Sequence, residues 1–434
     1  MITNLPFQKD YEAYRAAWDQ INPQIDANIE KYRKADFEVQ VVDAEGKPVP
    51  EAELKVRQLD HEFVFGCNGL MVGDLGEQEM EYQDSFGRLF NLVTTTLCWA
   101  VTEFEPDKFR FEEGVLDIFR RPPIDRIIKF AEKYNLKVKG QPLFCERWCP
   151  DWASKDPEEL KKQIANYFRK VAEHCGDKLD IVDVINEAFC APRRTPDFCL
   201  LDDEFTMVDW AFEAIQNVFP ESVDTELNEA NHVHNRMREK YYEVAKRVMD
   251  KKLPIKSLGI QYHLFTPQAG MEHIRDEKMG LTEMLKTYEL FNKLGLPMFI
   301  SEVTIPSTFE GTRQQGEALQ AEIARNLYRL WFSIENMAGI IYWNFKDGLA
   351  WKNEGDCLGC LMDQNFKEKP SYFALYELIK REWMTNELKI ADVNGNVALR
   401  GFKGEYRVTA EKDGCTVKGN LHVGKDQKLT LVLA

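Results

Sequence analysis

The stretch LDIVDVINE, residues 179–187, decides the fold class of this chain. Its Leu, Ile and Val residues form a nearly continuous apolar run, which is typical of a strand buried on both faces, as in a parallel sheet. The preceding segment, PEELKKQIANYFRKVAEHC (157–175), has apolar residues at helical spacing. A buried strand after an amphipathic helix indicates an α/β architecture with a parallel sheet.

The same alternation repeats along most of the chain. The other apolar runs are FVFGCN (63–68), FNLVTTTL (90–97), LKVKGQPL (136–143), SVDTELN (222–228), IKSLGIQYHL (255–264), LPMFISEV (296–303) and MAGIIYWNF (337–345). Eight βα units over about 320 residues are what a (β/α)₈ TIM barrel requires. An open doubly wound sheet is the alternative, but it would usually carry a Gly-rich phosphate loop, and the chain has neither GxGxxG nor a P-loop.

Both ends of the chain depart from this alternation. Residues 7–34 have the spacing of an amphipathic helix, with Asn22-Pro23 as a candidate break. Residues 37–61 and the chain from Leu388 onward read as short strands separated by turns, and neither set alone can bury a face. We therefore predict one accessory β-sandwich built from both ends. The predicted organisation is a helical segment at 1–36, sandwich strands at 37–61, the barrel at 62–384 and the remaining sandwich strands at 385–434.

The composition excludes several classes of partner. The 434 residues hold 56 Lys and Arg against 72 Asp and Glu, a net charge of −16. Nucleic acid and anionic membranes bind clustered positive charge, so neither is an expected partner. No signal-peptide pattern is visible at the start of the sequence, so we expect a cytoplasmic protein, or a secreted or periplasmic one if a signal was removed. The ten cysteines are scattered through a large chain, so we expect them to be mostly reduced thiols. The CxxC at Cys357 and Cys360 has no second CxxC and no nearby His, so we expect a loop rather than a zinc site.

Polar residues close several predicted strands, and in a TIM barrel the active site lies at those ends. The strand ends concerned are Asn186-Glu187, Gln261-Tyr262-His263, Ser301-Glu302 and Trp343-Asn344. Taken singly, each would more often be a solvated, core or packing residue. The fourth and seventh strands lie roughly opposite each other in the ring, so Glu187 and Glu302 share one mouth. Paired carboxyls that flank one bond are the apparatus of glycoside hydrolysis.

The chain resembles glycoside hydrolase family 10, the xylanase-type retaining β-glycosidases, over about residues 62–384. The motifs are FNLVT (90–94), EPDKFRF (105–111), GQPLFCERWCPDW (140–152), DVINEAF (183–189), LGIQYHL (258–264), ISEVT (300–304), IIYWNFKDGLAW (340–351) and LMDQNFKEKPSYFAL (361–375). The resemblance implies cleavage of β-glycosidic bonds in xylan, xylo-oligosaccharides or a related glycoside by double displacement. It implies a carbohydrate substrate, no cofactor and no metal.

The resemblance also implies residue roles. Glu187 is implied as the acid/base and Glu302 as the nucleophile. The remaining implied residues bind the sugar or hold the nucleophile: Asn186 at the sugar 2-hydroxyl, Gln261 and His263 at the nucleophile, Trp343 and Trp351 as aromatic walls, and Glu146, Trp148 and Asn231 as further substrate-binding residues.

The chain departs from the family where the sugar is gripped. The family's Glu, Asn and Lys on the non-reducing side are replaced by Thr96, Leu97 and Ala100. Buried contacts to sugar hydroxyls discriminate strongly between substrates. The alternative of a β-glycosidase that acts on a non-xylan glycan therefore stays open. The basic residues Arg147, Arg193 and Arg194 would allow an acidic sugar. A catalytically silent sugar-binding barrel is the other alternative, and the terminal sandwich is interpreted as structural.

Overall fold

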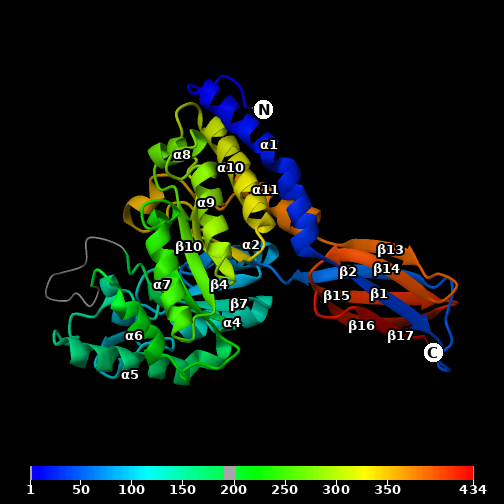
Figure 1. The fold of residues 1–434 in the computed structure, drawn as a ribbon, viewed down its shortest axis with the longest axis horizontal. Helices are drawn as coiled ribbons and strands as arrows, with labels where there is room; N and C mark the ends of the chain where they lie inside the picture. The colour runs from blue at the N-terminus through cyan, green and yellow to red at the C-terminus, as the bar shows by residue number, and fades with distance from the viewer. Residues whose placement is uncertain (1, 190–201, 434) are drawn as a thin grey trace.

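The computed structural model describes residues 2–189 and 202–433. Eight parallel strands close into a barrel in the order β10-β11-β12-β3-β4-β7-β8-β9 (Figure 1). Their bounds are β3 Val64–Asn68, β4 Leu92–Thr96, β7 Lys137–Gln141, β8 Ile181–Asn186, β9 Asp224–Glu229, β10 Ser257–His263, β11 Met298–Thr304 and β12 Met337–Tyr342. Each predicted apolar run contributes one strand, so the predicted TIM barrel is confirmed.

Helices connect successive barrel strands. They are α2 Glu79–Leu89, α3 Trp99–Thr102, α4 Ile124–Tyr134, α5 Pro157–Cys175, α6 Thr206–Ala214, α7 Arg238–Asp250, α8 Pro267–Ile274, α9 Leu281–Asn292 and α10 Arg313–Ser333, with α11 Pro370–Glu377 after β12. Local capping explains several starts. The Asp156 side chain accepts from the Glu159 amide at the start of α5, and Thr312 and Gln315 form a capping box at α10. Within the described ranges, no helix is both long and apolar enough to cross a membrane.

The N-terminal helix α1, Gln8–Arg33, is continuous through Pro23, so the candidate break at Asn22-Pro23 is wrong. The helix lies along α10 (Figure 1) and buries Tyr11 and Trp18 there. The Tyr11 hydroxyl also donates to Oε2 of Glu322 in α10, at 2.7 Å. Packing along this whole face compensates for the hydrogen bond that a proline removes from a helix.

The two ends of the chain form a β-sandwich beside the barrel (Figure 1). In one sheet, β1 (Lys34–Val42) pairs with β14 (Asn396–Phe402) and β17 (Lys428–Val432). In the other, β2 (Glu53–His61) pairs with β13 (Asn386–Ile390) and β15 (Gly404–Lys412), and β16 (Cys415–Val423) extends it. Phe37, Val39 and Val56 from the N-terminal strands share one buried core with Tyr406 and Leu431. The predicted accessory sandwich from both termini is confirmed.

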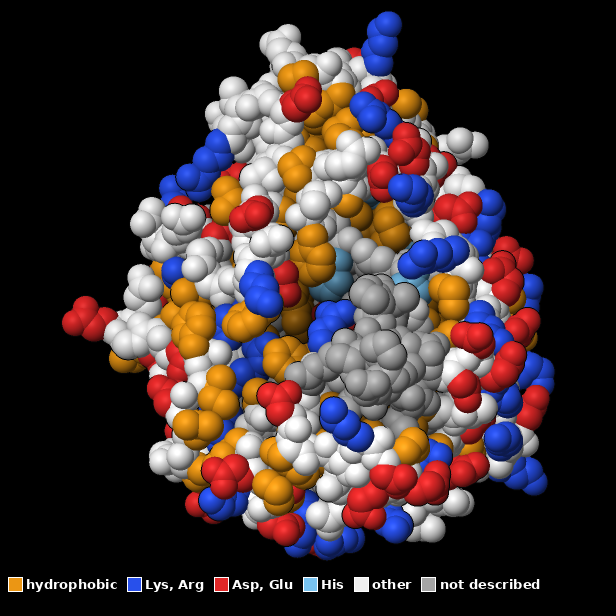
Figure 2. Space-filling model, turned by 90° about the vertical axis from the view of Figure 1, so that its left-hand side faces the viewer, with side chains coloured by type: hydrophobic (Ala, Val, Ile, Leu, Met, Phe, Trp, Pro, Cys, Tyr) orange, Lys and Arg blue, Asp and Glu red, His pale blue; other side chains and the backbone are white. Residues whose placement is uncertain are grey.

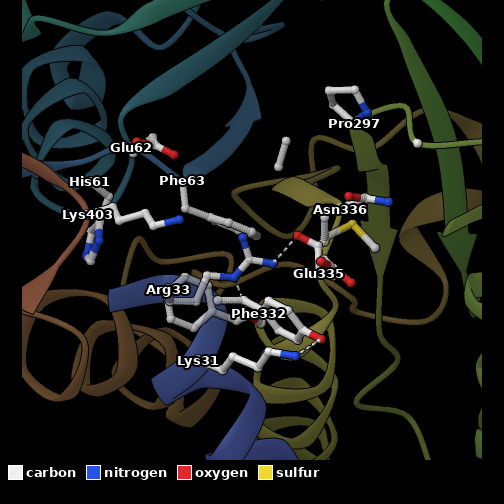
Figure 3. A pocket seen from close by; sticks show the side chains of 14 residues that line it. Lys31, Arg33, His61, Glu62, Phe63, Pro297, Phe332, Glu335, Asn336 and Lys403 are labelled. Atoms are coloured by element: carbon white, nitrogen blue, oxygen red, sulfur yellow. Dashed lines mark hydrogen bonds between the residues drawn. The ribbon is translucent and has the colours of Figure 1, made fainter. Parts of the chain in front are cut away.

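The sandwich is joined to the N-terminal end of the barrel, and a pocket of about 390 Å³ lies there. Figure 3 shows the side chains that line it. Its lining residues Phe63, Pro297 and Asn336 directly precede β3, β11 and β12. The guanidinium of Arg33 lies over the rings of Phe63 and Phe332, at 5.0 and 5.4 Å from their centroids, and donates to the Phe332 carbonyl. These contacts hold α1 against the barrel, so we assign the pocket a structural role.

Candidate active site

A second cavity of about 390 Å³ opens at the C-terminal ends of the barrel strands. Figure 2 shows the side of the molecule that lies away from the sandwich. This side is hollowed, and Lys, Arg and hydrophobic side chains surround the hollow. Six of the predicted substrate-binding residues line the cavity together with Glu187 and Glu302: Asn186, Gln261, His263, Trp148, Trp343 and Trp351. The structure therefore brings both carboxyls and most of the predicted set into one space.

Two predicted substrate-binding residues do not line this cavity. Asn231 clamps the backbone of His263, because its amide nitrogen donates to the His263 carbonyl at 2.6 Å and its oxygen accepts the His263 N–H at 2.8 Å. Glu146 is buried in the short 3₁₀ helix η2, Glu146–Trp148. The geometry gives Asn231 a positioning role for His263 in this state of the protein.

Glu187 directly follows β8 and has a left-handed backbone, with φ at 57°. Such a conformation costs energy for a non-glycine residue and is often found where function requires it. The Glu187 amide donates to the Asn228 carbonyl at 3.0 Å, which holds the turn in place. Its Oε1 accepts from Nε2 of Gln261 at 3.3 Å, and its Oε2 lies 3.2 Å from Nη2 of Arg147. The carboxyl thus faces the cavity between an amide and a guanidinium.

Glu302 lies within β11 and is 4% exposed. The Gln141 amide donates to its Oε1, and Nε2 of His263 lies 3.1 Å from its Oε2. The other ring nitrogen of His263 lies 2.9 Å from Oγ1 of Thr304. Burial lowers the pKa of His263 to about 4, so the ring is neutral at neutral pH. Gln141 was not among the residues predicted from the sequence. It ends β7, however, and polar residues at the ends of barrel strands are candidate site residues.

The surroundings of Glu302 disfavour its ionised form. Burial raises the pKa of Glu302 well above its ordinary value, and the charges of Glu187 and Asp183 act in the same direction. Lys139 and the hydrogen bond from Gln141 oppose these effects. Glu302 therefore keeps its proton to a higher pH than a solvated glutamate does.

A buried ionic cluster lies beneath the carboxyl pair. Lys139 of β7 forms ion pairs with Asp183 of β8, at 2.9 Å, and with Glu226 of β9, and all three side chains are fully buried. The Asn228 amide donates to Asp183 at 2.9 Å. Burial raises the pKa of Glu226 well above its ordinary value, against the attraction of Lys139. The cluster ties three neighbouring strands together at the level that positions Glu187.

Several charged residues of the cavity were missed by sequence reasoning: Arg120, Arg121, Lys352 and Glu354. They lie in the loop before α4 and in the 3₁₀ helix η6, Lys352–Gly355, so no strand-end pattern points to them. Glu354 accepts from the Trp343 indole N–H and from the Asn344 amide, both at 3.1 Å. Arg193 and Arg194 lie outside the described residues.

In the part of the chain that the structure describes, no three His, Cys, Asp or Glu side chains are placed to hold a metal ion. Cys357 and Cys360 are buried, and burial raises the pKa of the Cys357 thiol to about 11. Both are therefore uncharged thiols at neutral pH.

A TIM barrel whose strand ends bring two carboxyls into one cavity beside tryptophan rings has the architecture of a glycoside hydrolase. Residues 61–378 match the family described as "Glycosyl hydrolase family 10", and the chain belongs to this family. Membership of this family implies a carbohydrate substrate.

Individual relatives are distant. Endo-1,4-beta-xylanase B of Thermotoga neapolitana is 25% identical over 317 residues, which cover 70% of this chain and 84% of that protein. The anti-sigma-I factor RsgI6 of Acetivibrio thermocellus is 23% identical over 399 residues, which cover 90% of this chain but only 47% of that protein. The crystal structure of xylanase 10B from Thermotoga petrophila RKU-1 in complex with xylobiose aligns with a TM-score of 0.60 at 22% identity, covering 74% of this chain and 95% of that one. This last likeness shows the fold alone.

Proposed function

We propose that this protein is a retaining, endo-1,4-β-xylanase-like glycoside hydrolase. It cleaves β-glycosidic bonds of xylan, xylo-oligosaccharides or a related β-glycoside by double displacement. The observation that carries the proposal is the placement of Glu187 and Glu302 in one cavity. Gln261 links them, because it donates to Glu187 and is the register neighbour of Glu302 across β10 and β11.

The proposed mechanism divides the work between the two carboxyls. Glu302 attacks the anomeric carbon while Glu187 donates its proton to the departing oxygen, which leaves a glycosyl ester on Glu302. Glu187, now ionised, takes a proton from water, and the water hydrolyses the ester with retention of configuration. The Gln141 amide and the His263 ring support the proposed nucleophile role of Glu302, since their N–H groups can stabilise its carboxylate.

The cavity also contains the groups that a sugar needs. In this proposal Asn186 binds the 2-hydroxyl, and Trp343 and Trp351 provide flat apolar faces for the ring. Gln261 already donates to Asn186 at 3.3 Å, so the amide is oriented before substrate arrives. The proposed double displacement requires neither a metal nor an organic cofactor.

The test is a panel of 4-nitrophenyl β-glycosides (xyloside, glucoside, arabinoside, glucuronide and cellobioside), followed by oligosaccharides. Proton NMR at early times should show the β anomer as the first product. A first-formed α anomer would contradict the retaining mechanism, and failure to hydrolyse any β-glycoside would contradict the proposal as a whole.

A second candidate is a sugar-binding barrel without turnover. The similarity over 90% of this chain to a protein named as an anti-sigma factor favours it, because that name describes regulation and not hydrolysis. Calorimetry with unreacted oligosaccharides separates the two candidates. Binding without hydrolysis of any activated aryl glycoside would favour the binding protein.

A further inference from the structure

The active-site cavity is cationic in an otherwise acidic chain. Among the described residues that line it are four cationic side chains, Arg120, Arg121, Arg147 and Lys352, against three carboxyls, Glu187, Glu302 and Glu354. The whole chain carries a net charge of −16. The cationic side chains outnumber the carboxyls, so the described lining of the cavity has a surplus of positive charge. A neutral sugar would bind without compensating this positive charge.

Arg121 packs against two aromatic rings of the cavity wall. Its guanidinium carbon lies 5.0 Å from the ring centroid of Trp148 and 5.6 Å from that of Trp351. Its Nη1 donates to the Arg120 carbonyl at 2.8 Å. No carboxylate of the described residues pairs with it, and the remaining N–H groups of a guanidinium form a planar fork that fits a carboxylate. Two aromatic faces fix that fork without neutralising its charge.

The neighbouring Arg120 has a different role. It is 2% exposed, and it donates to the Leu349 carbonyl and, at 3.0 Å, to Oδ1 of Asn344. These bonds tie it to the loop after β12, where Trp343 and Trp351 also lie. Arg120 therefore anchors the loop that presents Arg121.

Arg147 connects the same wall to the catalytic acid. Its Nη2 lies 3.2 Å from Oε2 of Glu187, while its side chain is 64% exposed. Glycosidic bond cleavage requires the protonated form of Glu187, and a protonated carboxyl cannot form a salt bridge. An anion arriving at the cavity would offer Arg147 a new partner and release Glu187 for proton donation.

From these contacts we propose that the cavity selects β-glycosides that carry a carboxylate on the glycone, with Arg121 as its main contact and Arg147 as the second. The inference rests on the proposed function and names the substrate class of that site. The carboxylate can belong to the cleaved sugar or to the sugar next to it. Both sources present the same chemistry to the guanidinium groups.

The experiment uses two pairs of substrates, each matched except for one carboxylate. The first pair is 4-nitrophenyl β-D-glucuronide and 4-nitrophenyl β-D-glucoside, which places the charge on the cleaved sugar. The second is 4-nitrophenyl β-cellobioside and its derivative with the terminal glucose oxidised to glucuronic acid, which places the charge one sugar away. We expect kcat/KM for the acidic member of one pair to exceed that of its neutral partner by about 10- to 100-fold. The preference should fall as salt concentration rises.

The variants assign the preference to the guanidinium. R121Q should lower the acidic-to-neutral ratio by about 10- to 100-fold, and R147Q should lower it less. R121K keeps the charge but loses the planar fork, so its ratio should be intermediate. R381Q is the matched control, since it makes the same charge change in the segment after α11, outside the cavity. Its ratio should equal that of the unmodified protein.

The outcomes separate this inference from the proposed function. Equal hydrolysis of both members in both pairs, or a ratio that R121Q leaves unchanged, would overturn the inference while the proposed function stands. If no member is hydrolysed, calorimetry with the cellobioside pair decides. Tighter binding of the acidic member, weakened by R121Q, would support the inference and contradict the proposed hydrolase, whereas equal binding would contradict both.

Discussion

Nε2 of His263 lies 3.1 Å from Oε2 of Glu302, and burial makes this histidine neutral and Glu302 costly to ionise. Because Glu302 is the proposed nucleophile, Glu302→Gln should lose activity by a factor of about 10⁴ or more. The same variant should be more stable than the unmodified protein at pH 7. The folded pKa of Glu302 lies above its unfolded value, so the energetic cost is absent in acid and grows as pH rises. Melting temperatures at pH 7 and pH 4 check this, and a variant that is destabilised at pH 7 would contradict it.

Glu187 should show a different signature. An aryl leaving group of low pKa departs without much help, so Glu187→Ala should still form the glycosyl ester and then accumulate it, giving a burst of phenolate. Azide needs no general base, so it should restore turnover and yield the β-glycosyl azide. Unactivated oligosaccharides should lose roughly 10²–10⁴-fold. An α-azide product would show that Glu187 has been assigned the wrong role.

Polymeric xylan should be a poor substrate relative to short or aryl glycosides. Thr96 lines the cavity with a short neutral side chain, and Leu97 is fully buried away from it. Ala100 provides no polar group where related enzymes have a lysine. Comparison of kcat/KM on xylan and on xylo-oligosaccharides tests this. Efficient release of long products from xylan would count against it.

The two ends of the chain should depend on each other for stability. Leu431 of β17 is 3% exposed and pairs in register with Val41 of β1, whereas the adjacent Val432 is 50% exposed. Leu431→Ala should lower the free energy of unfolding by about 2–5 kcal/mol, as deletion of a buried leucine side chain does. Val432→Ala, on the opposite face, should change it by about 0.5 kcal/mol or less. Urea denaturation of both variants decides, and equal effects would mean that Leu431 contributes no core packing.

The junction between sandwich and barrel should weaken in mild acid. Burial lowers the pKa of His61 to about 4, and its Nε2 lies 3.0 Å from the Ile379 carbonyl. The unfolded chain binds a proton here at about pH 6.5 that the folded chain excludes, so stability is lost as pH falls from about 6.5 to 4. The unmodified protein should lose up to about 1.4 kcal/mol per pH unit more than His61→Gln over this range. Parallel urea midpoints for the two proteins would refute this.

The barrel, the sandwich and the placement of Glu187 and Glu302 at one mouth of the barrel could be predicted from the chain, because each rests on a local pattern. Apolar runs such as Leu179–Asn186 alternate with amphipathic helices, and closure of the barrel brings every strand end to one face. The predicted break at Asn22-Pro23 was wrong because it depended on a contact between distant parts of the chain. Packing of α1 along α10 outweighs the local preference of proline, and local spacing carries no information about that contact.

The electrostatic character of the site was decided by the tertiary structure. Arg121, Trp148 and Trp351 are far apart in sequence, and they meet only because three different loops fold over one mouth. Asn231 has the sequence position of a sugar ligand but binds the backbone of His263. The sequence by itself determined which groups stand at the strand ends. Their pairing and burial depend on distances and desolvation, which exist only once the chain has packed.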